Sequence, residues 1–260
     1  ATFSNSLNVY GLNPPAASAC SNTLPPAWRS ADIGYTVLAG DACYNNGTYT
    51  IKTASNDVWN TADGFHYVYQ PLTGDSVEIT ARVVSIQNTN PWAKCGIMFR
   101  ENLNPGSPNV FLALTPGNGA SFQKRISQSV ASASFAVKGA LAVPYWIKIK
   151  SAGNKYVGYT SADGLKWTAL DSITLAFGPH HYVGLAYTSL DTKIIGNAVV
   201  DNVTVLMEKP DSTRIVDFNG YNINNKYTQL IGSTENELNI DHYEIDRSTS
   251  TENFEMIGSV

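Results

Sequence analysis

The feature that most constrains this chain is a two-residue period of apolar side chains, repeated in many short segments. Apolar residues recur at every second position over 77–83 and over 145–149. The segment 199–207 keeps the same period, with Asp201 as the one polar residue in its apolar series. Such alternation buries one face of a strand and leaves the other polar, as in antiparallel sheets. No helix-length window shows a 3.6-residue period, so the sequence predicts an all-β fold.

Turn signals separate the predicted strands. They include Asn45-Asn46-Gly47, Thr73-Gly74-Asp75, Pro116-Gly117-Asn118-Gly119 and Asp163-Gly164. Many short strands joined by polar turns are typical of a β-sandwich or jelly roll. The span 27–207 is large for an immunoglobulin-type sandwich, so we expect a jelly roll of about a dozen strands there.

Two regions flank this span. Residues 1–26 contain Pro14-Pro15 and Pro25-Pro26 and are predicted to be a lead-in or linker. After Lys209-Pro210-Asp211 the chain becomes more charged. Its predicted strands cover 213–218, 227–231, 241–247 and 254–260. Four strands are few for a sandwich, so residues 208–260 are predicted to be a partial second β-sandwich domain.

Composition excludes two classes of partner. The net charge is −4, and no Lys/Arg cluster offers the positive surface that nucleic acids or anionic lipids require. No stretch approaches the roughly 18 apolar residues of a membrane-spanning helix. We therefore expect neither nucleic-acid binding nor membrane insertion.

The three cysteines, Cys20, Cys43 and Cys95, fit no zinc or redox spacing. Cys95 shares a strand face with Ala93, Ile97 and Phe99, which predicts a buried free thiol. Cys20 and Cys43 have two interpretations. They either form a disulfide that ties the N-terminal segment to an early strand, or are two small core residues.

Five segments together resemble the concanavalin A-like (laminin G-like) modules of large secreted bacterial proteins. In chain order they are Asp57 to Gln70, Asn90 to Glu101, Thr115 to Gly119, Tyr182 to Ala186 and Asp201 to Val205. The resemblance covers roughly 27–207 and departs from the family at Cys95, where a small apolar residue is usual. It implies a jelly-roll β-sandwich, carbohydrate binding, and a secreted or bacterial cell-surface location.

Two further segments carry weaker resemblances. The segment 235–258 is similar to the front half of the fibronectin type III-like domain of Bacteroidetes type IX secretion cargo, which implies that the type IX secretion machinery handles the full-length protein. Ser161 to Trp167 resembles a shortened sialidase Asp-box. That motif is structural and predicts a hairpin turn with Trp167 folded back onto the strand pair.

Sugar binding requires aromatic faces that stack on the ring and amide or carboxylate groups that bind hydroxyls. The aromatic candidates are Trp59, Tyr67, Tyr69 and Trp92. The polar candidates are Asp57, Asn60, Asp63 and Gln123. Trp59 and Trp92 adjoin turns, where sandwiches present binding loops. The alternative for each tryptophan is a structural role at the edge of the core.

Catalytic and metal chemistry find less support. A glycosidase needs two carboxylates roughly 5–10 Å apart, and the chain has no Glu-x-Asp-x-Glu strand. A nucleophile elbow is also missing, so no catalytic residue is assigned and no organic cofactor is expected. Laminin G-like sandwiches often hold calcium at the sheet rim, where Asp57, Asp63 and Asp201 are available oxygen donors.

Three functions follow in order of preference. The first is a non-catalytic carbohydrate-binding or adhesive module whose partner is a polysaccharide or other glycan. The second is a structural spacer of a large secreted protein. The third is a glycoside hydrolase or lyase. Exposed aromatic side chains near a sheet face would favour the first, fully buried Trp59 and Trp92 the second, and two convergent carboxylates in a cleft the third.

Overall fold

The computed structural model describes residues 23–74, 76–136, 141, 143–178, 180–207, 214–223, 227–235, 244–247 and 255–259. The chain divides into two compact units, residues 1–207 and 208–260. Every regular element in the described residues is a β-strand, which confirms the predicted all-β class. The described residues contain no apolar helix long enough to cross a membrane.

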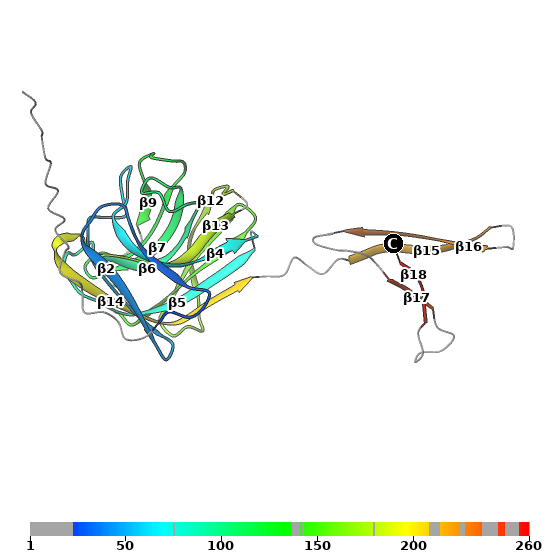
Figure 1. Cartoon of the computed structure of the whole chain (residues 1–260), viewed down its shortest axis with the longest axis horizontal. Helices are drawn as coiled ribbons and strands as arrows, with labels where there is room; N and C mark the ends of the chain where they lie inside the picture. Colours follow the sequence, from blue (N-terminus) through cyan, green and yellow to red (C-terminus); the bar gives the residue numbers. More distant parts are fainter. Residues whose placement is uncertain are drawn as a thin grey trace, which may run out of the picture. The chain divides into compact units, whose positions relative to one another are not determined.

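Two seven-stranded antiparallel sheets build the first unit (Figure 1). Sheet A has the order β1 (Arg29–Ile33), β4 (Phe65–Thr73), β13 (His180–Thr188), β6 (Lys94–Arg100), β7 (Asn109–Thr115), β8 (Gly119–Arg125), β9 (Ala133–Ala136). Sheet B has the order β12 (Thr168–Thr174), β11 (Lys155–Ser161), β10 (Tyr145–Ala152), β5 (Val77–Ile86), β14 (Asp191–Met207), β3 (Thr48–Ser55), β2 (Thr36–Asn45). In Figure 1, β5 and β14 lie in one layer and β6, β7 and β13 in the other.

The main core lies between the sheets and follows the two-residue period. Sheet A contributes Ile97, Phe99, Leu112, Phe122 and Leu185, and sheet B contributes Ile51, Ile79, Ala81, Ile147 and Ile149, all fully buried. Burying these alternating apolar faces against each other is what drives sheet onto sheet. The predicted sandwich is therefore confirmed.

The outer face of sheet A, which points away from sheet B, is also covered. Tyr67, Met98 and Phe111 form a second buried cluster there with Val58, from the connection between β3 and β4. Three connections cover this face: 56–64, 101–108 and 126–132. Backbone hydrogen bonds join them, from Asp63 to Pro105, Ser129 to Gly106 and Ser132 to Asn60. The site described below lies beside this cover.

Strand β14 corrects one detail of the predicted alternation. Ala198 and Val200 face the core, and further along the strand Val203 and Val205 pack against it. The face changes because the pairing of β14 with β5 shifts register between Asp201 and Thr204, as in a β-bulge. Asn202 takes a positive φ of 50° there. Asp201 therefore lies on the outer face, where its carboxylate binds Arg82 at 2.5 Å, and it does not interrupt an apolar series.

The cysteines behave differently from one another. Cys95 is a free, buried thiol, as predicted, and burial raises its pKa, which disfavours the reactive thiolate. Cys43 in β2 is disulfide-bonded, so it is not a free core residue. Cys20, its predicted partner, lies outside the described residues.

The second unit consists, in its described part, of two hairpins. Strand β15 (Arg214–Ile223) pairs with β16 (Tyr227–Glu235), and β17 (Glu244–Arg247) pairs with β18 (Glu255–Ser259). All four lie within or overlap the strands expected from the sequence. The fibronectin type III-like identity of this unit stays a prediction.

The Asp-box-like turn joins β11 to β12 as a hairpin, as predicted. Asp163 organises it, because its Oδ1 accepts hydrogen bonds from the backbone nitrogens of Leu165 and Lys166, each at 2.8 Å. Trp167 folds back onto the sheet, with the Lys148 ammonium 4.4 Å from its ring centroid. The motif stabilises the hairpin by satisfying backbone donors.

We expect the Asp163 carboxyl to titrate below the ordinary aspartate range, because hydrogen bonds from Lys166, Leu165 and Ser161 lower its pKa. A lowered folded-state pKa stabilises the turn above the pKa of the unfolded chain, and this stabilisation is lost as pH falls toward the folded value. NMR titration of the side-chain carboxyl carbon measures it, and Ser161→Ala should move the midpoint back upward. A midpoint at or above the ordinary range would contradict the assignment.

Candidate functional site

A pocket of about 430 Å³ opens beside the covered face of sheet A. It is lined by Asp57, Trp59, Asn90, Trp92, Lys94, Ser121, Gln123, Ser134 and Leu190. Strands β6, β8 and β9 supply Lys94, Ser121, Gln123 and Ser134. The other residues come from the connections 56–64 and 87–93 and from the turn before β14. Segments far apart in the chain therefore converge on one site.

Two tryptophans, together with Leu190, give the pocket its apolar surface. Trp92 is 43% exposed, and Trp59 is half-buried. The turn that carries Trp92 is fixed by Asn90, whose Oδ1 accepts a hydrogen bond from the Trp92 backbone nitrogen at 2.9 Å and whose carbonyl accepts one from Ala93. Neither indole is enclosed in the core, so both remain available to a ligand.

An ion pair between Lys94 and Asp57 provides the charge of the pocket. The Lys94 ammonium donates to Oδ1 of Asp57. The two side chains differ in exposure, at 5% for Lys94 and 30% for Asp57. Of the two charged groups, the carboxylate is therefore the more accessible to a ligand.

Neutral polar groups complete the lining. Gln123 is fully buried and donates from Nε2 to the Val58 carbonyl at 2.6 Å. Its Oε1 has no hydrogen-bond partner within the described residues. The hydroxyls of Ser121 and Ser134, on the paired strands β8 and β9, lie 2.9 Å apart. These groups supply acceptors and hydroxyls rather than further charge.

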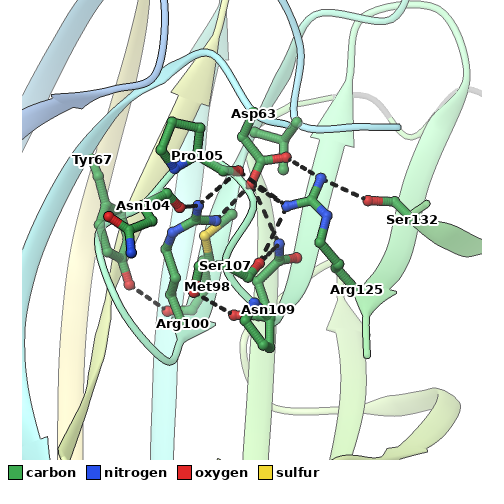
Figure 2. A network of polar contacts seen from close by, with 12 residues as sticks. Asp63, Tyr67, Met98, Arg100, Asn104, Pro105, Ser107, Asn109, Arg125 and Ser132 are labelled. Atoms are coloured by element: carbon green, nitrogen blue, oxygen red, sulfur yellow. Dashed lines mark hydrogen bonds and ion pairs between the residues drawn. The ribbon is translucent and has the colours of Figure 1, made fainter. Parts of the chain in front are cut away.

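A buried charge cluster stands next to the pocket (Figure 2). Figure 2 shows the Asp63 carboxylate between the guanidinium groups of Arg100 and Arg125. Arg125 binds both carboxylate oxygens at 2.6 Å, and Arg100 binds Oδ2 at 2.6 Å. All three side chains are completely buried. Desolvation lowers the pKa of Arg100, an effect that Asp63 opposes.

Because the cluster holds two cations and one anion, backbone carbonyls must solvate the second positive charge. The guanidinium groups of Arg100 and Arg125 donate to the carbonyls of Trp59, Asn60, Asn104, Pro105, Ser107 and Val130. These carbonyls belong to the same three connections that cover sheet A. Arg125 thereby fixes the backbone at Trp59, which shapes the pocket wall.

The structure brings four of the eight sugar-binding candidates together at the pocket: Asp57, Trp59, Trp92 and Gln123. Asn60 does not line it. Asp63 does not line the pocket, because its carboxylate forms ion pairs with the two arginines. Tyr67 is also excluded, because it is buried under the loops and its hydroxyl donates to the Met98 carbonyl at 3.0 Å. Burial likewise removes Tyr69. The last two are core aromatics.

Sequence reasoning missed Asn90, Lys94, Ser121, Ser134 and Leu190. Asn90 and Lys94 lie two positions either side of Trp92, so proximity to that candidate was one available signal. Ser121 precedes Gln123 by two positions in a strand and therefore shares its face. Ser134 lies opposite Gln123 only through the pairing of β8 with β9, which no local pattern specifies.

The three aspartates considered for calcium do not fit a calcium site. Asp57 binds Lys94, Asp63 binds two arginines, and Asp201 binds Arg82. Calcium needs several oxygen donors around one point. Within the part of the chain that the structure describes, no group of three or more His, Cys, Asp or Glu side chains converges in this way.

No protein-family model and no curated protein matches the chain. Among solved structures, a functionally unknown protein from Saccharomyces cerevisiae is similar over 65% of this chain and 92% of its own, with 16% identity and a TM-score of 0.52. The carbohydrate-binding module CBM66 from Bacillus subtilis is similar over 69% of this chain and 94% of its own, with 16% identity and a TM-score of 0.46. Peanut lectin is similar over 70% of this chain and 94% of its own, with 9% identity and a TM-score of 0.41. At such identities the similarity concerns the fold alone, which is a β-sandwich of two antiparallel sheets.

Proposed function

We propose that the sandwich formed by residues 27–207 is a non-catalytic carbohydrate-binding module whose ligand is a polysaccharide or other glycan. The observation that carries this proposal is the pocket, in which Trp59 and Trp92 accompany the polar groups of Asp57 and Gln123. Its volume of about 430 Å³ lies within the roughly 300–1,000 Å³ of small-ligand sites.

This lining matches the two kinds of surface on a sugar ring. The C–H faces of a pyranose are apolar and stack on indole rings, whereas the ring hydroxyls need directed acceptors and donors. The indoles of Trp59 and Trp92 serve the first requirement. The Asp57 carboxylate and the hydroxyls of Ser121 and Ser134 serve the second.

A binding role rather than catalysis is supported by the acid groups at the site. Of the nine lining residues, Asp57 alone carries a carboxylate, and Lys94 holds it in an ion pair. Glycosidases of the usual kind place two carboxylates across the scissile bond. The pocket offers the acceptor needed for recognition without that pair.

The exposure of the tryptophans favours binding over a purely structural spacer. In a purely structural spacer, nothing would favour leaving a large indole exposed to solvent beside a pocket. Trp92 is 43% exposed and lines the pocket together with half-buried Trp59. Such placement of aromatic groups is typical of ligand sites.

A secreted or bacterial cell-surface location is part of the same proposal. Cys43 is disulfide-bonded, and disulfides persist mainly in oxidising compartments outside the cytosol. Handling of the full-length protein by the type IX secretion machinery remains a prediction from the resemblance of residues 235–258.

We expect Trp92→Ala and Trp59→Ala each to weaken retention on an insoluble polysaccharide by about tenfold or more, since removing an aromatic anchor that the bound ligand covers costs about 2 kcal/mol. Depletion assays with the full chain on insoluble xylan, mannan and β-glucan measure the effect, after a glycan array has ranked the ligands. The matched control is Trp167→Ala, which removes an indole packed on Lys148, outside the pocket. Unchanged retention in both pocket variants, with intact β-structure by circular dichroism, would refute the site.

A further inference from the structure

We infer that the pocket selects uncharged sugar residues and rejects uronic acids and sulfated sugars, because Asp57 neutralises the Lys94 ammonium and is the more exposed of the two charged groups. This inference rests on the proposed glycan binding and names its ligand class. It concerns the two charged residues among the nine that line the pocket.

The first step is the position of the positive charge. Lys94 begins β6, on the outer face of sheet A, and only 5% of its side chain is exposed. Its ammonium donates to Asp57 Oδ1. A carboxylate or sulfate entering the pocket would have to compete with Asp57 for this buried cation. The nearby Arg125 is also inaccessible, because it is completely buried and bound to Asp63.

The second step is the position of the negative charge. The Asp57 side chain is 30% exposed. The Lys94 ammonium donates its hydrogen bond to Oδ1, and no hydrogen bond joins Oδ2 to the described residues. A carboxylate oxygen in this position accepts a strong, charge-assisted hydrogen bond from a sugar hydroxyl. Against a second carboxylate it is repulsive, because like charges brought together at an interface are strongly unfavourable.

The third step is the character of the remaining polar groups. Gln123 donates one amide N–H to the Val58 carbonyl, and its carbonyl oxygen has no hydrogen-bond partner among the described residues. Asn90 uses its side-chain oxygen on the Trp92 backbone. The Ser121 and Ser134 hydroxyls hydrogen-bond each other. The Asn90 amide N–H groups and one hydrogen of the serine pair are donors, whereas Asp57 and Gln123 present acceptor oxygens. A hydroxyl-rich neutral sugar both donates and accepts and so matches this lining, whereas a carboxylate or sulfate can only accept and leaves the Asp57 and Gln123 oxygens without a donor.

The experiment compares one polysaccharide in two charge states. The affinity of the full chain is measured for the neutral polymer that it binds best and for the same polymer after its primary alcohols have been oxidised to carboxylates. If xylan is the best ligand, xylan is compared with glucuronoxylan. For the unaltered chain we expect at least tenfold weaker affinity for the acidic form at low salt. Raising the salt should narrow this difference, because the repulsion is partly screened.

Asp57→Asn removes the negative charge that neutralises Lys94 but keeps the shape of the side chain. It should weaken binding of the neutral polymer several-fold. It should strengthen binding of the acidic polymer, because Lys94 then has no anionic partner at the pocket. The matched control is Asp171→Asn, which makes the same charge change on the exposed strand β12 of sheet B and should leave both affinities unchanged.

The outcomes separate this inference from the proposed function. If the unaltered chain binds the acidic form as tightly as the neutral one, or more tightly, the selection is wrong while glycan binding stands. If it retains neither neutral nor acidic polysaccharides across the array, glycan binding itself is wrong. The comparison and its salt dependence use the unaltered chain, so both tests remain decisive even if Asp57→Asn fails to fold.

Discussion

Asp63→Ala is expected to lower the free energy of unfolding by about 3–5 kcal/mol, the usual cost of removing one partner from a buried ion pair. Asp63 is the anion that faces both Arg100 and Arg125, and all three side chains are completely buried. Without it, two guanidinium groups would remain close together in a region of low dielectric. Urea denaturation followed by tryptophan fluorescence measures the loss.

The matched control is Asp201→Ala, which also removes an aspartate from an arginine. The Asp201–Arg82 pair is partly exposed, so its loss should cost about 1 kcal/mol or less. Equal costs for the two variants would show that the Asp63 cluster is not the electrostatic centre that its burial indicates. A second consequence is functional: because Arg125 also holds the Trp59 carbonyl at 3.1 Å, the Asp63 variant should lose glycan retention wherever its fold survives.

The sandwich could be predicted from the sequence because its cause is local. Residues that alternate along one strand already specify which face is buried, and the strands 77–86 and 145–152 follow that rule. The rule failed at β14, where a bulge at Asn202 moves the inward face from Val200 to Val203. A single extra residue in one strand shifts the period. The local signal is Asn202, a residue type that tolerates a positive φ, and an asparagine alone does not specify a bulge.

The role of Asp63 could not be predicted for a different reason. Its position near Trp59 in the chain suggests a sugar-binding residue. Its actual partners, Arg100 and Arg125, come from strands β6 and β8. Arg100 adjoins Glu101 in the sequence, yet it binds Asp63 instead. Long-range pairing of charges depends on how the connections fold over sheet A, which local patterns do not contain.

The pocket was partly predictable, since aromatic residues beside turns are a local signal. Trp59 and Trp92 were found in this way, and both line the same pocket. Lys94 was overlooked because a lysine beginning a strand usually points into solvent. Its burial follows from the ion pair with Asp57, 37 positions earlier in the chain. The charge selection inferred above therefore depends on a contact visible only in three dimensions.

Gly96→Ala is expected to lower the free energy of unfolding by about 3 kcal/mol or more, at or beyond the upper end of the cost of overpacking. Gly96 lies in the middle of β6, between β13 and β7. An added Cβ would lie 1.9 Å from the Leu112 carbonyl oxygen and 2.6 Å from the Ala113 Cα. Both are backbone atoms of β7, so no side-chain rotation can relieve the contact.

Gly184→Ala tests the same cause on the next strand, because its Cβ would lie 2.1 Å from the Val68 carbonyl oxygen. Gly178→Ala is the control, since nothing lies within 4 Å of its added Cβ, and it should change the free energy of unfolding by about 0.5 kcal/mol or less. Thermal unfolding followed by circular dichroism compares the three variants. If Gly96→Ala and Gly184→Ala unfold at the same temperature as Gly178→Ala, the strands of sheet A are not as closely apposed as the fold requires. If they unfold much earlier, the glycines within two of the family-like segments, 90–101 and 182–186, have a steric explanation: they let neighbouring backbones approach beneath the face that carries the pocket.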